Sequence, residues 1–273
     1  MTREEGQGSL LLAWQVNDKH CLVIGSGDVA LSRVKHLLRA RAKITILSGE
    51  KESGMNSEII ELHKQGKIFN LVNRNYDIGD LSMYEKMASE QQVDWRDYKK
   101  IQEIIKEEMF AVVCCCIDDH DLSEQIYYQC KVKRLPVNVA DRPPLCDFYF
   151  GSMINQDALQ IMISTNGKSP RLLKLIKDEI EKQFRGVELS RAVDNLGIIR
   201  ARLRERIVTQ NDETSIESRM HWIKSLTDRY SIRQWSELPI VDDEVVDRIV
   251  RYYPGHPPSD FQEFKSSIFD VTF

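Results

Sequence analysis

The stretch LVIGSGDVAL, residues 22–31, combines the features of one structural unit. An apolar run that ends at a glycine is typical of a buried parallel strand. Gly25, Gly27 and Ala30 follow the G-x-G-x-x-G/A pattern, and the apolar residues after Ala30 recur at helical spacing. A strand, a glycine turn and a helix in this order predict a dinucleotide-binding turn.

Each small residue of this turn has a physical reason. Gly25 permits a tight turn, Gly27 lets the backbone approach a pyrophosphate, and Ala30 keeps the helix close to the strand. The phosphates would lie at the helix amino terminus, where N–H groups and the helix dipole favour anions. We therefore expect the cofactor-binding residues of this turn to be Gly25, Ser26, Gly27, Asp28 and Val29.

An acidic residue follows the next predicted strand. KITIL, residues 43–47, is that strand, and Glu50 comes three residues after it. Dinucleotide-binding folds place a ribose-binding acid about 20 residues after the glycine turn. Glu50 is therefore the predicted partner of a ribose hydroxyl, and its charge favours NAD over NADP.

Further strands and helices alternate along the amino-terminal half. Apolar runs over residues 68–76, 109–119 and 135–141 are predicted strands, and residues 122–134 form a predicted helix. This alternation predicts an α/β, Rossmann-type, doubly wound parallel sheet. Residues 78–109 are polar, acidic and helix-prone, so we expect a surface helical insertion anchored by Trp95.

Composition narrows the class of protein. The 273 residues carry a formal net charge of -4, which offers no global basic field for nucleic acid. No run of about 18 apolar residues predicts a membrane span. The amino terminus lacks the pattern of a secretory signal, so the expected location is the cytoplasm.

The six cysteines form no C-x-x-C pair. Cys114, Cys115 and Cys116 are adjacent on a predicted strand, where successive side chains point to opposite faces. They therefore cannot converge on one ion, and we expect reduced thiols and no protein metal site.

Two acids follow predicted strands at the edge where such sheets bind ligands. Asp118 follows the fourth strand and Asp141 the fifth. Asp141 precedes a rigid Arg142-Pro-Pro turn and is placed to accept a proton beside a nicotinamide ring, although a turn or capping role fits the spacing too. Which acid lies nearer the reacting carbon stays open. His120 with its neighbouring aspartates is better explained as a solvated loop than as an iron site.

Two segments resemble a known family. NVADRPPLCDFYFGSMI, residues 138–154, and LQIMISTNGKSPRL, residues 159–172, resemble the fungal bifunctional siroheme synthases, which are precorrin-2 dehydrogenases and sirohydrochlorin ferrochelatases. The resemblance implies oxidation of precorrin-2 with NAD+ and then insertion of ferrous iron as a substrate. It also implies that Asp141 serves both steps, and that the macrocycle itself supplies the nitrogen ligands.

The resemblance implies further roles. The acetate and propionate groups of the tetrapyrrole would meet the predicted substrate-binding residues, which are Arg142, Asn166, Gly167, Lys168, Ser169 and Arg171. A second anion seat would lie at the helix that opens at Ser169-Pro170. The middle region would build a homodimer in which each site borrows residues from its partner.

These inferences divide the chain into three parts. Residues 1–147 form the expected NAD-binding domain, residues 148–188 the dimerisation region with a hairpin over 148–163, and residues 189–273 a helical domain. An amphipathic helix is predicted over residues 189–207. Two other functions remain open, namely a dehydrogenase without chelatase activity and a regulator that senses NAD without turnover.

Overall fold

The computed structural model describes residues 9–49, 54–86, 94, 96–156, 159–166, 168–206 and 213–269. These residues form two compact units, Ser9–Phe150 and the residues from Gly151 onward. Each unit has a hydrophobic core of its own. Within the described ranges, no helix is long and apolar enough to cross a membrane.

A parallel sheet is the centre of the first unit. Its strands are β1 (His20–Ile24), β2 (Lys43–Leu47), β3 (Asn70–Val72), β4 (Phe110–Cys115) and β5 (Val137–Val139). They pair in the order β3-β2-β1-β4-β5, and every pairing is parallel. This is the strand order of a doubly wound dinucleotide fold, so the predicted Rossmann-type sheet is confirmed.

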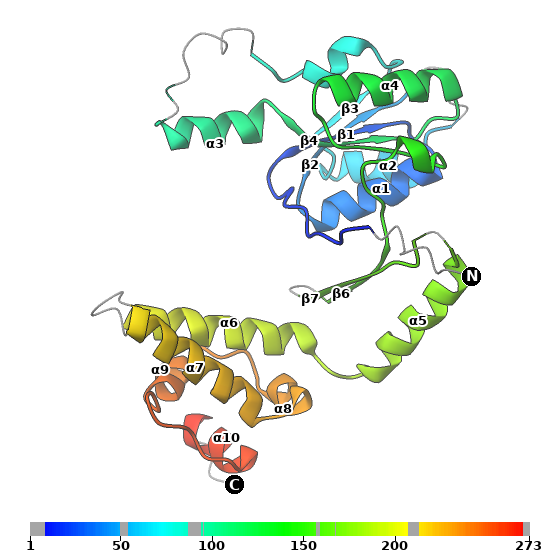
Figure 1. Ribbon diagram of the computed structural model, residues 1–273. Helices are drawn as coiled ribbons and strands as arrows, with labels where there is room; N and C mark the ends of the chain where they lie inside the picture. The colour runs from blue at the N-terminus through cyan, green and yellow to red at the C-terminus, as the bar shows by residue number, and fades with distance from the viewer. Residues whose placement is uncertain are drawn as a thin grey trace, which may run out of the picture. The chain divides into compact units, whose positions relative to one another are not determined.

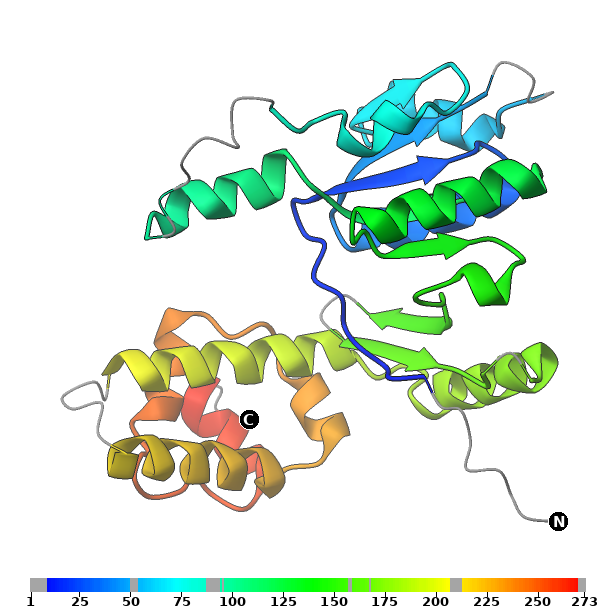
Figure 2. The ribbon, with the colours of Figure 1, turned by 45° about the horizontal axis from the view of Figure 1, so that its top comes forward.

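Helices cover both faces of this sheet (Figures 1 and 2). The helices α1 (Asp28–Arg39) and α2 (Ser57–Lys64) pack on one face, and α4 (His120–Val132) packs on the other. The side chain of Cys114 packs in the core on the face of α1 and α2, and that of Cys115 packs in the core on the face of α4. The predicted alternation of these strand cysteines is therefore confirmed, and burial raises the pKa of both thiols.

The segment expected as a surface insertion has two different parts. It begins with the 3-10 helix η1 (Ile78–Ser82), whose Asp80 and Leu81 are buried, so this part is not on the surface. The buried carboxylate of Asp80 pairs with Arg74, which compensates its desolvation. The second part, α3 (Tyr98–Glu107), has no buried residue. Trp95 lies outside the described residues.

The hairpin begins later than the sequence predicts. Its strands are β6 (Ser152–Gln156) and β7 (Leu159–Ile163), so Phe148–Phe150 is not part of it. Phe148 and Phe150 pack instead against the core beside α1, and the guanidinium of Arg33 lies 4.6 Å from the centre of the Phe150 ring. Alternating aromatic residues have the pattern of a strand, but here that pattern serves packing against a helix.

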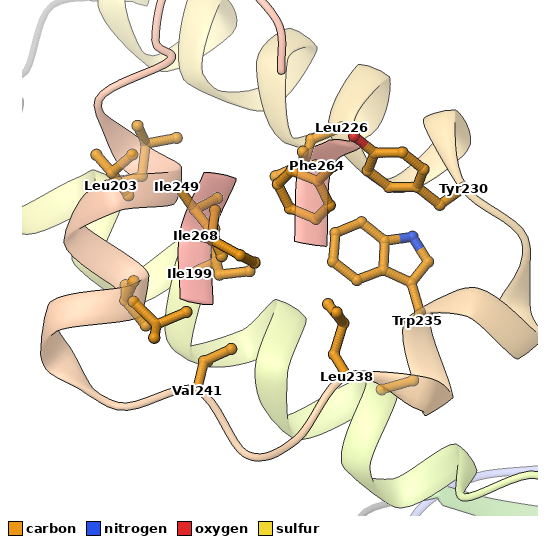
Figure 3. Close-up of a cluster of buried hydrophobic side chains, with 14 of the residues drawn as sticks. Ile199, Leu203, Leu226, Tyr230, Trp235, Leu238, Val241, Ile249, Phe264 and Ile268 are labelled. Carbon is orange, nitrogen blue, oxygen red and sulfur yellow. The ribbon is translucent and has the colours of Figure 1, made fainter. Parts of the chain in front are cut away.

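Helices make up the rest of the second unit. They are α5 (Pro170–Gln183), α6 (Leu189–Arg206), α7 (Glu213–Arg229), α8 (Ile232–Glu237), α9 (Asp243–Val250) and α10 (Phe261–Phe269). The helices α6 to α10 enclose a core in which Trp235, Tyr230 and Phe264 pack closely (Figure 3). The helix predicted over 189–207 is observed to Arg206, and residue 207 lies outside the described residues.

Candidate functional site

The glycine turn joins β1 to α1. Gly25 has a φ of 113°, which side chains rarely adopt, and its N–H donates to the carbonyl of Leu47 at 2.8 Å. A Cβ at Gly25 would lie 2.3 Å from the carbonyl oxygen of Cys116, on the neighbouring strand end. The chain therefore requires glycine at position 25 for the fold itself.

Gly27 is different. It is the N-cap residue of α1 with an extended backbone, and a Cβ there would have no heavy atom within 4 Å. The space beside Gly27 is open at the helix amino terminus, where the first backbone N–H groups have no partners inside the helix. This arrangement fits a pyrophosphate, as the sequence predicts.

Gly25→Ala is expected to destabilise the first unit by about 3 kcal/mol or more, because the new methyl group meets backbone atoms and the φ is unfavourable. Urea unfolding of the purified variant measures this loss. Gly27→Ala is the matched control, with an expected change below about 1 kcal/mol. Equal losses in the two variants would contradict the assignment of Gly25 to the fold and Gly27 to the ligand.

Polar contacts fix the turn from two sides. The hydroxyl of Ser26 is buried and lies 2.9 Å from that of Ser48, at the end of β2. Asn56, the N-cap of α2, donates from its amide to the carboxylate of Asp28 at 2.7 Å, and its N–H donates to the Ser26 carbonyl. Val29 stays partly exposed beside them. Sequence reasoning missed Asn56, although an asparagine before a helical segment is a capping signal.

Glu50, the predicted ribose partner, lies outside the described residues, which stop at Gly49 and resume at Gly54. Its role therefore stays a prediction.

The two candidate acids lie at the carboxyl edge of the sheet. Asp118 follows β4 and Asp141 follows β5, and both are exposed. Because β4 and β5 are parallel neighbours, their carboxyl ends meet at the same edge as the glycine turn. The guanidinium of Arg142 donates to the carbonyl of His120 at 3.0 Å, which ties the two acid-bearing loops together.

The acidic loop around His120 has a structural explanation. Asp119 is the N-cap of α4, and its carboxylate accepts from the N–H of Leu122 at 3.0 Å. Among the described residues, no group of three or more histidine, cysteine or acidic side chains could hold a metal ion.

The other predicted substrate-binding residues lie in the second unit. Asn166, Lys168, Ser169 and Arg171 surround the connection from β7 to α5, whereas Arg142 lies in the first unit. Asn166 has a φ of 50°, and Ser169 is the N-cap of α5 with Pro170 at the first helical position. Gly167 lies outside the described residues.

Comparison with known proteins identifies the family. Residues 12–152 match a family model described as "Putative NAD(P)-binding", residues 156–183 one described as "Sirohaem biosynthesis protein central", and residues 187–256 one described as "Sirohaem biosynthesis protein C-terminal". The siroheme biosynthesis protein met8 of Schizosaccharomyces pombe is 34% identical over 92% of this chain and 82% of its own length. The chain belongs to the family of fungal siroheme biosynthesis proteins.

Other relatives match different shares of the chain. The siroheme biosynthesis protein of the same name in Saccharomyces cerevisiae is 33% identical over 85% of this chain and 87% of its own length. The siroheme synthase of Thioalkalivibrio sulfidiphilus is 31% identical over 61% of this chain, but only 28% of that longer protein is matched. A solved structure named SirC, precorrin-2 dehydrogenase, shares the fold, with a TM-score of 0.53 and 18% identity over 96% of this chain and 100% of that chain.

Proposed function

We propose that this member of the siroheme biosynthesis family oxidises precorrin-2 to sirohydrochlorin with NAD+ and then inserts ferrous iron to give siroheme. The observation that carries the proposal is the shared edge of the sheet. The open glycine turn at Gly27 and the carboxylate of Asp141 both follow strands of one parallel sheet, in a chain of this family.

The same carboxylate can serve both steps. Oxidation removes a hydride and a proton from precorrin-2, and bound NAD+ would supply the hydride acceptor. Metal insertion displaces two pyrrole N–H protons as ferrous iron enters. We assign Asp141 as the proton acceptor in each step, with Asp118 as the second carboxylate of the site.

Basic side chains are available to bind the carboxylates of the substrate. The tetrapyrrole carries many carboxylates, and Arg142 is held at the carboxyl edge of the sheet by its contact with His120. In the second unit, Lys168 and Arg171 are exposed beside the amino terminus of α5. We assign these residues, with Asn166, Gly167 and Ser169, to the acetate and propionate groups of the substrate.

A spectral time course of the purified protein tests the proposal. Precorrin-2 with NAD+ should give NADH absorbance and the sirohydrochlorin spectrum, and later ferrous iron should give the siroheme spectrum. Omission of NAD+ should prevent the first change. NADH formation without accelerated metal insertion would identify a dehydrogenase without chelatase activity. Binding of NAD+ without any turnover would identify a regulator that senses the nucleotide.

We also propose that the protein is a homodimer through its middle region. In the described residues, α5 buries none of its side chains, and the β6–β7 hairpin buries only Ile154. The side chains of Leu172, Leu175 and Ile176 are 51%, 49% and 38% exposed, and their spacing places them on one face of α5. An apolar helix face of this kind suits an isologous contact with a second copy.

Leu175→Glu is expected to raise the dimer dissociation constant by about 100-fold or more, because it places a charge in the apolar contact. Sedimentation velocity over a range of protein concentrations measures the change. Ile240→Glu is the matched control, since Ile240 is 74% exposed and lies away from α5 in the sequence. A dimer that persists unchanged in the Leu175 variant would place the interface elsewhere.

A further inference from the structure

The loop that carries Asp141 folds back on the strand from which it leaves. Asn138 of β5 forms an isolated antiparallel bridge with Cys146, eight residues later. Asp147 continues this return: its N–H donates to the Val137 carbonyl at 2.8 Å, and its carboxylate accepts from the Val137 N–H at 3.0 Å. Lys131 of α4 donates to the other carboxylate oxygen at 2.6 Å. These contacts therefore hold the start and the end of the loop together.

Asp141 itself has an unusual backbone. Its φ is 57°, in the left-handed region that few residues other than glycine, asparagine and aspartate adopt. A backbone hydrogen bond from the N–H of Arg142 to the carbonyl of Val139 closes its turn at 3.4 Å. This distance is long for such a bond, so other contacts of the turn contribute to holding its shape.

The thiol of Cys146 supplies these contacts. Its Sγ lies 3.1 Å from the carbonyl oxygen of Val139 and 3.3 Å from that of Arg142, the two carbonyls on either side of Asp141 in the turn. Burial raises the pKa of this thiol, so the sulfur keeps the proton that it donates. The two carbonyls share the single thiol proton. The sulfur therefore contacts both ends of the turn, at Val139 and at Arg142.

Asn138 holds the sulfur in turn. Asn138 is only 3% exposed, and its amide donates to the Cys146 Sγ at 3.4 Å and to the Phe148 carbonyl at 2.9 Å. A chain of hydrogen bonds therefore runs from the buried amide, through the thiol, to the backbone on both sides of Asp141. Each member orients the next.

We propose that Cys146 is a positioning residue for Asp141, and that its thiol holds the carboxylate in the orientation in which it accepts protons from the substrate. The inference rests on the proposed function, because Asp141 is the proton acceptor only there. It adds that a residue with no contact to substrate sets the rate through the Val139–Arg142 turn.

The test uses a thiol series in the full chain. Cys146→Ala removes the donor and is expected to lower kcat for NADH formation about tenfold, with the Kd for NAD+ changed less than about twofold. Cys146→Ser keeps a donor at the same position and is expected to restore kcat to within about threefold of wild type. Cys21→Ala is the matched control, because Cys21 is fully buried near the amino end of β1, the end opposite the ligand edge. It should lose stability and keep kcat within about twofold.

A double-mutant cycle separates positioning from a general loss of stability. In an Asp141→Asn background, Cys146→Ala should reduce the residual rate no further, because the group that it positions is already gone. Equal further loss in both backgrounds would overturn the inference, as would wild-type kcat in Cys146→Ala. A wild-type protein that forms no NADH would overturn the proposed function itself, and with it this role for the thiol.

Discussion

Asp141→Asn is expected to slow NADH formation from precorrin-2 by about 10²- to 10⁴-fold, the usual contribution of a positioned proton acceptor. Asparagine has nearly the same size and also tolerates a φ of 57°, so the turn should keep its shape. The variant loses the negative charge of the carboxylate and with it the ability to take up a proton. Insertion of iron into supplied sirohydrochlorin should fall as well, because the same carboxylate is assigned to both steps. Initial rates of the two reactions, measured separately, give both effects.

Two measurements make this result specific. The affinity for NAD+ should change less than about twofold, since Asp141 follows β5 and the glycine turn follows β1. Asp118→Asn is the matched control, from the neighbouring strand, and we expect a loss below about tenfold in each reaction. A larger loss in the Asp118 variant would exchange the roles of the two acids. Metal insertion at the wild-type rate in Asp141→Asn would exclude a shared proton acceptor.

Local sequence patterns are sufficient to predict the sheet and the residues at its carboxyl edge. LVIGSGDVAL specifies a strand, a turn that tolerates no side chain at Gly25, and a helix that begins at Asp28. Parallel strands then require that Asp118 and Asp141 follow their strands at this same edge. These predictions depend on residue type and on spacing within a few residues, and both are visible in a single sequence.

The contacts behind Asp141 are not predictable in that way. Cys146 has no spacing that marks it, because its partners are two backbone carbonyls, whose positions depend on how the loop closes. Phe148 and Phe150 have the pattern of a strand because alternation looks the same whether the partner is a strand or a helix. Sequence patterns report the period of an element, whereas the identity of its packing partner is set by tertiary structure.

Gly27→Asp is expected to reduce the affinity for NAD+ by about 100-fold or more and to stop NADH formation at ordinary NAD+ concentrations. The new carboxylate would occupy the open space at the amino terminus of α1, where the pyrophosphate would lie, and would repel it. The fold should not suffer. Gly27 is the N-cap with φ −81° and ψ −167°, an extended backbone that aspartate adopts readily, and aspartate is a preferred N-cap residue.

The same variant separates the two activities. Insertion of iron into supplied sirohydrochlorin needs no nucleotide, so its rate in Gly27→Asp should stay within about twofold of wild type. Titration with NAD+ by calorimetry, urea unfolding and the two rate assays would be run on one preparation. Gly27→Ala should give an intermediate affinity, because it adds bulk without charge. The substitution changes only the position proposed for the pyrophosphate and leaves Asp141 and Arg142 in place. If the folded Gly27→Asp variant also lost metal insertion, the nucleotide and the macrocycle could not occupy the separate positions assigned to them at this edge.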